Sequence, residues 1–362
     1  MEDLTVAKKR VLYIDCLKGF AILLVVIGHV FDGYLRASLF IDHSSFMSSG
    51  YNLIYAFHMA LFFMISGFVF CKAYIKNGMA KLSLNKQILN IICIYLVFSI
   101  LFGLFKCAMG SFTNTNVSLL DILLIWMKPI YPYWYLYVLL FYYLIFRLKV
   151  VYQVKTFSIL APLFLVSVAS NFVPHNISYL FEIKHFLYYC FFFGLGVMIS
   201  SHEKWYTTKE VLFAVPAFMI SIILMLVIRV GYTYEDFLDG KIIGTANLNT
   251  IVAYGLCLML LFLFRLICSD EKYLHVKFLS FLGQYSLEIY VIHCIFTAGN
   301  RVVLSKFGIN IFYLNIILNV VISITAPIVF SLLCKKIGIH KYIFRPAYVI
   351  VEKRTNRMKG EA

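Results

Sequence analysis

The stretch KKRVLYIDCLKGFAILLVVIGHVF, residues 8–31, decides how the rest of the chain is interpreted. Most of it is an apolar run long enough for one membrane-spanning helix, which needs about 20 residues. Asp15 and Lys18 nevertheless lie near one end of this run, and His29 lies near the other. Because Lys18 and His29 are eleven residues apart, their side chains point the same way, about 16 Å apart along the helix axis. Asp15 joins the same face, so the segment predicts a membrane helix with one polar stripe.

The composition of the chain is typical of a multi-span membrane protein. Hydrophobic residues make up 62% of the 362 residues, charged residues only 14%, and the mean hydropathy is +0.88. A soluble protein of this length has too much surface for so few charges. The nine cysteines form no C-x-x-C pair and mostly lie in apolar runs. We interpret them as small apolar side chains rather than as metal ligands or disulfides.

Ten apolar segments are long enough to cross a membrane, which predicts an all-α polytopic bundle of about ten transmembrane helices. They are residues 11–31, 52–75, 87–106, 132–148, 156–173, 178–200, 211–229, 248–266, 278–297 and 310–334. The stretch SLLDILLIWM, residues 118–127, is too short to span. We expect a re-entrant or interfacial helix there.

The distribution of positive charge predicts that both termini are cytoplasmic. With this orientation, 23 of the 32 Lys and Arg residues lie on the inner side and 7 on the outer side, as the positive-inside rule requires. The same bias explains the net charge of +15 without a nucleic-acid partner. We divide the chain into a transmembrane domain, residues 1–334, and a basic cytoplasmic tail, residues 335–362. The tail either lies along the anionic inner membrane surface or acts only as a topology signal.

Several titratable side chains are predicted to lie in the outer halves of the spans, at a depth similar to that of His29. His58 lies in the second span, in YAFHMALFFMISGF, and His293 lies near the outer end of the ninth, in GQYSLEIYVIH. Glu182 and His185 are one turn apart at the outer end of the sixth span. Titratable groups inside a membrane are costly, and they are therefore candidates for function.

Each of these features also has an ordinary structural interpretation. Asp15 and Lys18 suit an i,i+3 ion pair near the inner interface, with the Lys18 ammonium reaching toward water. Aromatic residues such as Trp134 suit an interfacial belt. The chain has no HExxH or H-x-H pattern, no Gly-rich phosphate loop and no G-x-S-x-G. We therefore expect no metal site, and the ISGF sequence around Ser66 does not indicate a serine nucleophile.

Four stretches resemble the acyltransferase-3 family of integral membrane O-acyltransferases, closest to its fucose 4-O-acetylase-like and polysaccharide O-acetyltransferase branch. They are IDCLKGFAILLVVIGH (14–29), IYAFHMALFFMISGFVF (54–70), YWYLYVLLFYYLIF (133–146) and LGQYSLEIYVIH (282–293). The stretches follow the order and spacing of the family, and the ten-span layout also matches. The resemblance implies a multi-pass enzyme of a bacterial inner membrane. It also implies transfer of an acyl group, most commonly acetyl, from acyl-CoA to a hydroxyl of a cell-envelope or exported glycan.

The basic-x10-His motif of the family maps onto Lys18 and His29. The resemblance implies that Lys18 helps to hold the acyl donor and that His29 works at the acyl-transfer centre. Family members often carry an R-x-x-R motif at the inner start of the third span. Here that region reads SLNKQILNI, with Lys86 but no second basic residue three positions later. We expect Asp15 and Lys86 to lie on the donor side with Lys18.

The expected chemistry assigns further roles. A neutral imidazole suits a general base near pH 7, so we expect His29 to take the proton of the acceptor hydroxyl. Glu182 is a candidate for orienting this imidazole, and His58 is a further catalytic candidate that could donate a hydrogen bond to the thioester oxyanion. Candidates for contacting the substrate or the thioester oxyanion are Trp134, Tyr135, Ser66, Tyr290 and His293.

The expected partners are acyl-CoA, a glycan or lipid-linked sugar acceptor, and membrane lipids. The alternative function is a multi-span transporter or flippase with an internal polar pathway, because intramembrane Asp, Lys and His residues also serve proton relays. Transporters often show inverted repeats and helices broken by Gly or Pro. The chain shows no such repeat and few prolines within its spans, which favours the enzyme. A structural or sensory membrane protein would leave the polar stripe unexplained.

Overall fold

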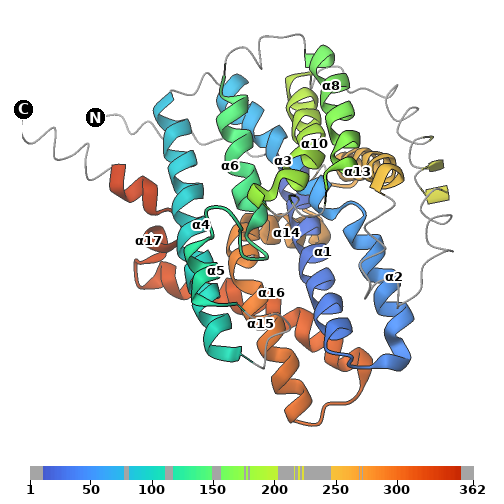
Figure 1. Cartoon of the computed structure of the whole chain (residues 1–362), viewed down its shortest axis with the longest axis vertical. Helices are drawn as coiled ribbons and strands as arrows, with labels where there is room; N and C mark the ends of the chain where they lie inside the picture. The colour runs from blue at the N-terminus through green and yellow to red at the C-terminus, as the bar shows by residue number, and fades with distance from the viewer. Residues whose placement is uncertain are drawn as a thin grey trace, which may run out of the picture.

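The computed structural model describes residues 11–76, 81–110, 117–148, 156–174, 180–202, 246–268 and 272–351, with a few isolated positions besides. Within these ranges the chain forms a bundle of helices and no strand (Figure 1). Seven of the described helices are long and apolar enough to cross a membrane. The predicted all-α polytopic bundle is confirmed.

The first half of the bundle begins with the long helix α1, Leu12–Arg36, which carries the polar stripe without interruption. The following apolar segment is divided into α2 and α3, because the chain turns at residues 56–57. The helices that follow α1 in this half are α2 (Ser44–Tyr55), α3 (His58–Phe70), α4 (Lys81–Met109), α5 (Leu119–Leu123), α6 (Trp134–Phe146), α8 (Thr156–Ala169) and α10 (Ile183–Ser201).

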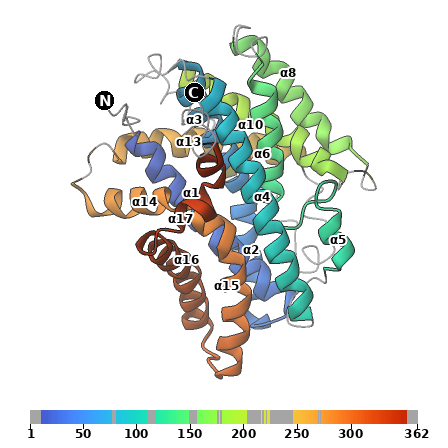
Figure 2. The same ribbon diagram turned by 90° about the vertical axis from the view of Figure 1, so that its left-hand side faces the viewer.

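The second half contains a hairpin of two long helices, α15 and α16, which meet at one end of the molecule (Figures 1 and 2). A shorter helix, α14, precedes them and packs against α1. The helices of this half are α13 (Ala246–Ile267), α14 (Leu274–Gln284), α15 (Ser286–Lys306), α16 (Phe312–Lys336) and α17 (His340–Phe344).

The structure changes the bounds of several predicted spans. The predicted span 278–297 is wrong, because α14 ends and α15 begins at Tyr285. The break falls in the stretch GQYS, residues 283–286, whose polar residues are too few to be resolved when hydropathy is averaged over a whole span. The helices α6 and α8 have 13 and 14 residues, fewer than the roughly 17 that a span needs. The predicted span 211–229 lies mostly outside the described residues.

The short helix α5 lies within the stretch 118–127 that we expected to be too short to span. Its start is held by a capping box in which Ser118 Oγ accepts a hydrogen bond from the Asp121 backbone, and the Asp121 carboxylate accepts one from the Ser118 backbone. Leu119, Leu120 and Leu123 are exposed. Exposed leucines on a capped helix of five residues fit an interfacial position rather than a span.

Two glycine pairs bring helices into direct backbone contact. A Cβ atom at Gly19 of α1 would lie 2.0 Å from the Leu279 carbonyl oxygen, and one at Gly283 of α14 would lie 1.9 Å from that of Asp15. The pair Gly67 and Gly196 joins α3 to α10 in the same way. Small residues at helix contacts allow such close approach, which is a main source of packing energy inside a membrane.

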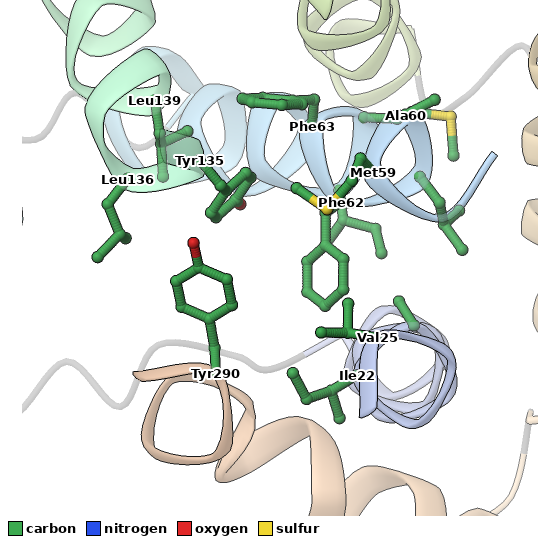
Figure 3. Packing of buried hydrophobic residues seen from close by; sticks show 14 of the residues in the cluster. Ile22, Val25, Met59, Ala60, Phe62, Phe63, Tyr135, Leu136, Leu139 and Tyr290 are labelled. Carbon is green, nitrogen blue, oxygen red and sulfur yellow. The ribbon is translucent and has the colours of Figure 1, made fainter. Parts of the chain in front are cut away.

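Apolar and aromatic side chains fill the centre of the bundle between α1, α3, α6 and α15. Figure 3 shows Ile22 and Val25 of α1 beneath Phe62 of α3, with Tyr135 of α6 facing Tyr290 of α15. The two tyrosine rings have centroids 5.5 Å apart. All five side chains are buried, so this packing fixes how the four helices present their polar residues to one another.

The first part of the predicted tail packs on the bundle. Phe344 of α17 is buried, and its carbonyl oxygen accepts a hydrogen bond from Asn90 Nδ2 of α4 at 3.3 Å. His340 Nε2 lies 3.1 Å from Glu288 Oε1 of α15. In both views α17 lies beside α4 (Figures 1 and 2). Residues up to 351 are therefore held by contacts with two helices of the bundle, and residues 352–362 lie outside the described ranges.

We predict that Gly283→Ala destabilises the protein while Gly299→Ala does not. The new Cβ at residue 283 would meet backbone atoms of α1, whereas at residue 299 nothing lies within 4 Å. Overpacking of this kind costs about 1–3 kcal/mol. The melting temperature of each purified variant in the same detergent measures the effect. Equal melting temperatures for the two variants would contradict the close contact between α1 and α14.

Candidate functional site

His29 lies in the last third of α1, where side chains from three other segments surround its ring. The centroid of its ring is 4.9 Å from that of His293 on α15 and 5.1 Å from that of Tyr131, which precedes α6. The ring of Tyr55, at the end of α2, is 6.5 Å away. We call His29, Tyr55, Tyr131, His293 and Cys294 the histidine cluster.

The two tyrosines form a hydrogen-bonded chain that ends on His29. Tyr55 Oη lies 2.8 Å from Tyr131 Oη, which lies 3.2 Å from His29 Nδ1. The Tyr131 side chain is 42% exposed and His29 is partly exposed, so the histidine cluster reaches the molecular surface on this side. A hydroxyl both donates and accepts, so Tyr131 matches either neutral tautomer of His29.

Two hydrogen bonds fix the segment that carries Tyr131 against α15. Tyr290 Oη donates to the Pro132 carbonyl at 2.6 Å, and Tyr133 Oη donates to the Val291 carbonyl at 2.7 Å. Both hydroxyl groups belong to buried residues. These two hydrogen bonds between tyrosine hydroxyls and backbone carbonyls hold Tyr131 at a set distance from His29 of α1 and His293 of α15.

His293 and Cys294 form the inner wall of the histidine cluster. His293 Nδ1 lies 2.9 Å from the carbonyl oxygens of both Ile289 and Tyr290. Because a carbonyl only accepts, Nδ1 carries the hydrogen and Nε2 keeps its lone pair. Cys294 Sγ lies 3.3 Å from this Nε2 and 3.9 Å from His29 Nδ1.

His58 lies beside the histidine cluster at the turn between α2 and α3. Its Nδ1 donates to the Ile54 carbonyl at 2.8 Å, and its ring centroid is 4.6 Å from that of Tyr55. Because its Nδ1 hydrogen is used, a neutral His58 has no second N–H for an oxyanion. The predicted donor role of His58 is therefore not supported by this geometry. Its contact with Tyr55 makes it a supporting residue for the tyrosine chain.

Glu182 lies apart from His29. Glu182 Oε2 is 2.6 Å from Nδ1 of His185, and the His185 ring stacks on Trp134 with centroids 4.3 Å apart. The predicted contact of Glu182 with His29 is not found among the described residues. Sequence spacing showed only that Glu182 and His29 share a depth. Glu182 directly precedes α10, and its carboxylate turns toward His185, three residues later.

Other side chains that were predicted to contact the substrate are hydrogen-bonded to groups within the bundle. Ser66 Oγ lies 2.7 Å from Tyr135 Oη, and Tyr290 donates to Pro132. Tyr135 is buried. Because the Tyr290 hydroxyl hydrogen already has a backbone acceptor, the structure does not favour Tyr290 as an oxyanion donor. Its evident function is to position Tyr131.

On the donor side predicted from the sequence, the structure shows an ion pair. Lys18 Nζ lies 3.2 Å from Asp15 Oδ1, on the face of α1 that carries His29. Lys86 lies in α4, whose main packing partners are α5, α6 and α17. Its neighbour Gln87 accepts a hydrogen bond from Tyr348 Oη. Lys86 is thus placed beside the C-terminal segment, whereas Lys18 and Asp15 form their own pair on α1.

Further polar side chains extend the stripe of α1 beyond His29. Asp32, one turn from His29, is buried and lies 2.8 Å from Arg36 Nε. Arg301 of α15 is also buried, and its Nη1 donates to the Gly33 carbonyl at 2.5 Å. The stripe therefore continues to the end of α1, where Asp32 offers a carboxylate close to the histidine cluster.

Sequence analysis did not single out four residues of this region, which are Tyr55, Tyr131, Cys294 and Asp32. Two of them carried a usable signal, because Cys294 directly follows His293 and Asp32 is one helical turn after His29. Tyr55 is the last residue of α2 and Tyr131 lies in a turn, and spacing along α1 gives no guide to either. The ligand atoms of His29, His293 and Cys294 lie within 4.8 Å of one another, so these three side chains are also a possible set of metal ligands.

The chain matches one protein-family model over most of its length. Residues 11–336 match the family model of the acyltransferase-3 domain, described as an acyltransferase domain. The chain belongs to the acyltransferase-3 family. This acyltransferase is therefore an integral, multi-pass membrane protein, as the seven apolar helices indicate. A search of curated proteins and a search of solved structures each found no match.

In an acyltransferase, the histidine cluster offers the groups that acyl transfer needs. His29 supplies a titratable nitrogen, the two tyrosines supply hydroxyl donors, and Cys294 supplies a thiol. Family membership favours this enzymatic use over the transporter that we considered from the sequence. The Asp15–Lys18 pair lies on the same helix face, about 16 Å along the axis from His29.

We predict that Tyr131→Phe lowers the rate of acyl transfer roughly 10-fold or more without changing stability. The substitution removes the hydroxyl that contacts His29 and leaves the exposed ring in place. Tyr313→Phe, which removes a hydroxyl from a tyrosine that is 61% exposed on α16, is the matched control. Turnover and melting temperature are measured for both. Equal turnover in the two variants would show that the Tyr131 hydroxyl does not act on His29.

Proposed function

We propose that this protein transfers an acetyl group from acetyl-CoA, or another acyl group from its acyl-CoA, to a hydroxyl of a cell-envelope or exported glycan. The observation that carries the proposal is the position of His29, partly exposed and hydrogen-bonded to Tyr131, on a helix that also carries the Asp15–Lys18 pair. We place the protein in a bacterial inner membrane, with both termini cytoplasmic.

The long straight helix α1 supports a route for the donor. Acyl-CoA is a cytoplasmic compound whose phosphates attract cations, and Lys18 lies near the predicted cytoplasmic end of α1. The helix rises about 16 Å from Lys18 to His29. A donor that places its polar part near Lys18 can extend its pantetheine arm along the polar stripe. Its thioester then comes close to His29.

His29 acts as the general base for the acceptor. If its Nδ1 hydrogen is donated to Tyr131 Oη, then Nε2 carries a lone pair and takes the proton of the acceptor hydroxyl. The hydroxyl oxygen forms a bond to the thioester carbonyl carbon, and the bond between this carbon and the CoA sulfur then breaks. The departing thiolate recovers the proton from the imidazolium. Asp32, one turn further along α1, is buried and paired with Arg36.

The tyrosine chain supplies the nearest hydroxyl donors for the oxyanion. When His29 donates to Tyr131, Tyr131 donates in turn to Tyr55. Tyr55 is in turn hydrogen-bonded to Tyr51, and we propose that the oxyanion accepts a hydrogen bond from this chain of tyrosine hydroxyls. Trp134, Tyr135 and Ser66 lie in the adjoining aromatic packing, and we assign them to the walls that exclude water around the site.

We predict that His29→Ala lowers acyl transfer by a factor on the order of 10²–10⁴, since the acceptor loses its base. His275→Ala, which removes an exposed histidine from α14, is the control and should keep full activity. Purified proteins in lipid nanodiscs are given acetyl-CoA and envelope glycan, and the release of free CoA is measured. Full activity of His29→Ala would exclude the general-base role. Loss of one acyl mass from envelope glycans of a deletion strain would identify the acceptor.

We predict that Lys18→Ala raises KM for acyl-CoA several-fold with a smaller change in kcat, because Lys18 binds the donor rather than the reacting atoms. Lys277→Ala, which removes an exposed lysine from α14, is the control for the loss of one positive charge. The two parameters come from initial rates at varied acyl-CoA. A fall in kcat at unchanged KM would remove Lys18 from the donor site.

A further inference from the structure

Cys294 differs from four other cysteines in what its sulfur contacts. The sulfur atoms of four other cysteines lie against backbone carbonyl oxygens, which are those of Val276 for Cys16, Val117 for Cys107, Leu187 for Cys190 and Phe57 for Cys257. Cys294 Sγ instead lies between two imidazole nitrogens, 3.3 Å from His293 Nε2 and 3.9 Å from His29 Nδ1. A thiol beside an imidazole lone pair is the arrangement of a cysteine nucleophile and its base.

The base in this arrangement is oriented by the backbone. Both carbonyl oxygens that accept from His293 Nδ1 belong to the preceding turn of α15, so the imidazole is held with its Nε2 lone pair toward Cys294. His293 is fully buried, and its hydrogen-bonding capacity is therefore met only by protein groups. A nucleophile, a base and a third group that orients the base form the general pattern of covalent catalysis.

We propose that Cys294 carries the acyl group during transfer, with His293 as the base that activates its thiol. The inference rests on the proposed function, because it takes acyl-CoA as the donor. It divides the transfer into two steps at one place, first from the CoA sulfur to the Cys294 sulfur and then from Cys294 to the acceptor hydroxyl.

The first step exchanges one thioester for another. Cys294 Sγ forms a bond to the acyl carbonyl carbon while its proton moves to His293 Nε2. The bond between that carbon and the CoA sulfur breaks, and the CoA thiolate takes the proton back from His293. The products are free CoA and an acyl-cysteine. Because a thioester is consumed and a thioester is formed, the acyl group keeps its reactivity and no other reactant is needed.

The second step uses His29. With the acyl group on Cys294, the acyl carbon lies next to the ring of His29, whose Nδ1 is 3.9 Å from Sγ. His29 removes the proton of the acceptor hydroxyl, whose oxygen then bonds to the acyl carbon. The bond from that carbon to Cys294 Sγ breaks, and the sulfur takes the hydrogen of His29 Nδ1, which faces it, so that His29 is again neutral with the acceptor's proton on Nε2. Two histidines thus serve two separate proton transfers on either side of one sulfur.

This order of events suits an enzyme whose two substrates are presented on opposite sides of a membrane. Free CoA can leave before the acceptor binds, so the site never has to hold both large substrates at once. Cys294 is only 8% exposed, whereas Tyr131 beside it is 42% exposed. The acyl-cysteine is therefore shielded from water, while the acceptor approaches from the side of Tyr131 and His29.

The test uses the full-length protein in nanodiscs with acetyl-CoA labelled in the acetyl group and no acceptor. We expect release of up to one CoA per chain and the acetyl mass on the peptide that contains Cys294, removed by hydroxylamine as a thioester is. Cys294→Ala should lose the label and lower transfer roughly 10²-fold or more. Cys257→Ala, which removes a buried thiol facing a backbone carbonyl, should keep both.

Histidine variants separate the two steps. His29→Ala should still acquire the label on Cys294 but fail to pass it to added glycan. His293→Gln should acquire the label more slowly than wild type. If Cys294→Ala does not fold, the labelled peptide of the wild-type protein and the two histidine variants still decide the question.

Three results would overturn the inference. Transfer by Cys294→Ala at the wild-type rate, with no label on wild-type Cys294, would exclude the acyl-cysteine while leaving the proposed function intact. One zinc ion per chain, lost in Cys294→Ala, would show that His29, His293 and Cys294 hold a metal instead. If the wild-type protein releases no CoA even with acceptor present, the proposed function fails, and the inference fails with it.

Discussion

Hydrocarbon offers no hydrogen bonds, and this constraint shapes every polar contact in the bundle. Backbone groups satisfy it by forming helices, and several buried polar side chains satisfy it by finding partners on neighbouring helices. Tyr34 of α1 contacts Asn315 and Asn319 of α16 in this way. Asn319 also donates to the Thr297 carbonyl of α15. These contacts tie three helices together at the end of the molecule beyond His29, and they leave the histidine cluster as a place where polar groups are arranged around reactive atoms.

The histidine cluster depends on a close contact that contains no reactive group. Gly19 and Gly283 bring the backbones of α1 and α14 together, and α15 begins directly after α14. The position of α15 relative to α1 is therefore set a few residues before His293. Tyr290 and Tyr133 then join α15 to the segment that carries Tyr131. Reactive side chains from distant parts of the sequence meet because backbone contacts place their helices first.

The sequence predicted well what depends on one helix at a time. The polar stripe of α1, the Asp15–Lys18 pair and the all-helical bundle followed from spacing and hydropathy, because both patterns repeat with the helix. The family came instead from the resemblance of four sequence stretches, and the family model confirms it. Contacts between helices did not follow. Glu182 shares a depth with His29 but turns toward His185, and Tyr131 enters the histidine cluster from a turn. The break at Tyr285 was missed because hydropathy averaged over a span does not resolve the short stretch GQYS, residues 283–286, and does not report a change of helix direction.

Because of the break at Tyr285, the number of residues between Gly283 and Cys294 matters as much as which residues stand there. Gly283 is fixed against α1, and Cys294 must face His29 only eleven residues later. A helix turns by about 100° per residue, so the gain or loss of one residue between them would rotate Cys294 out of the histidine cluster with every side chain intact. No such demand applies to residues 307–311, which join α15 to α16 at the far end of the hairpin. Homologous chains are therefore free to vary in length at that turn, whereas the interval from Gly283 to Cys294 should be kept to the residue.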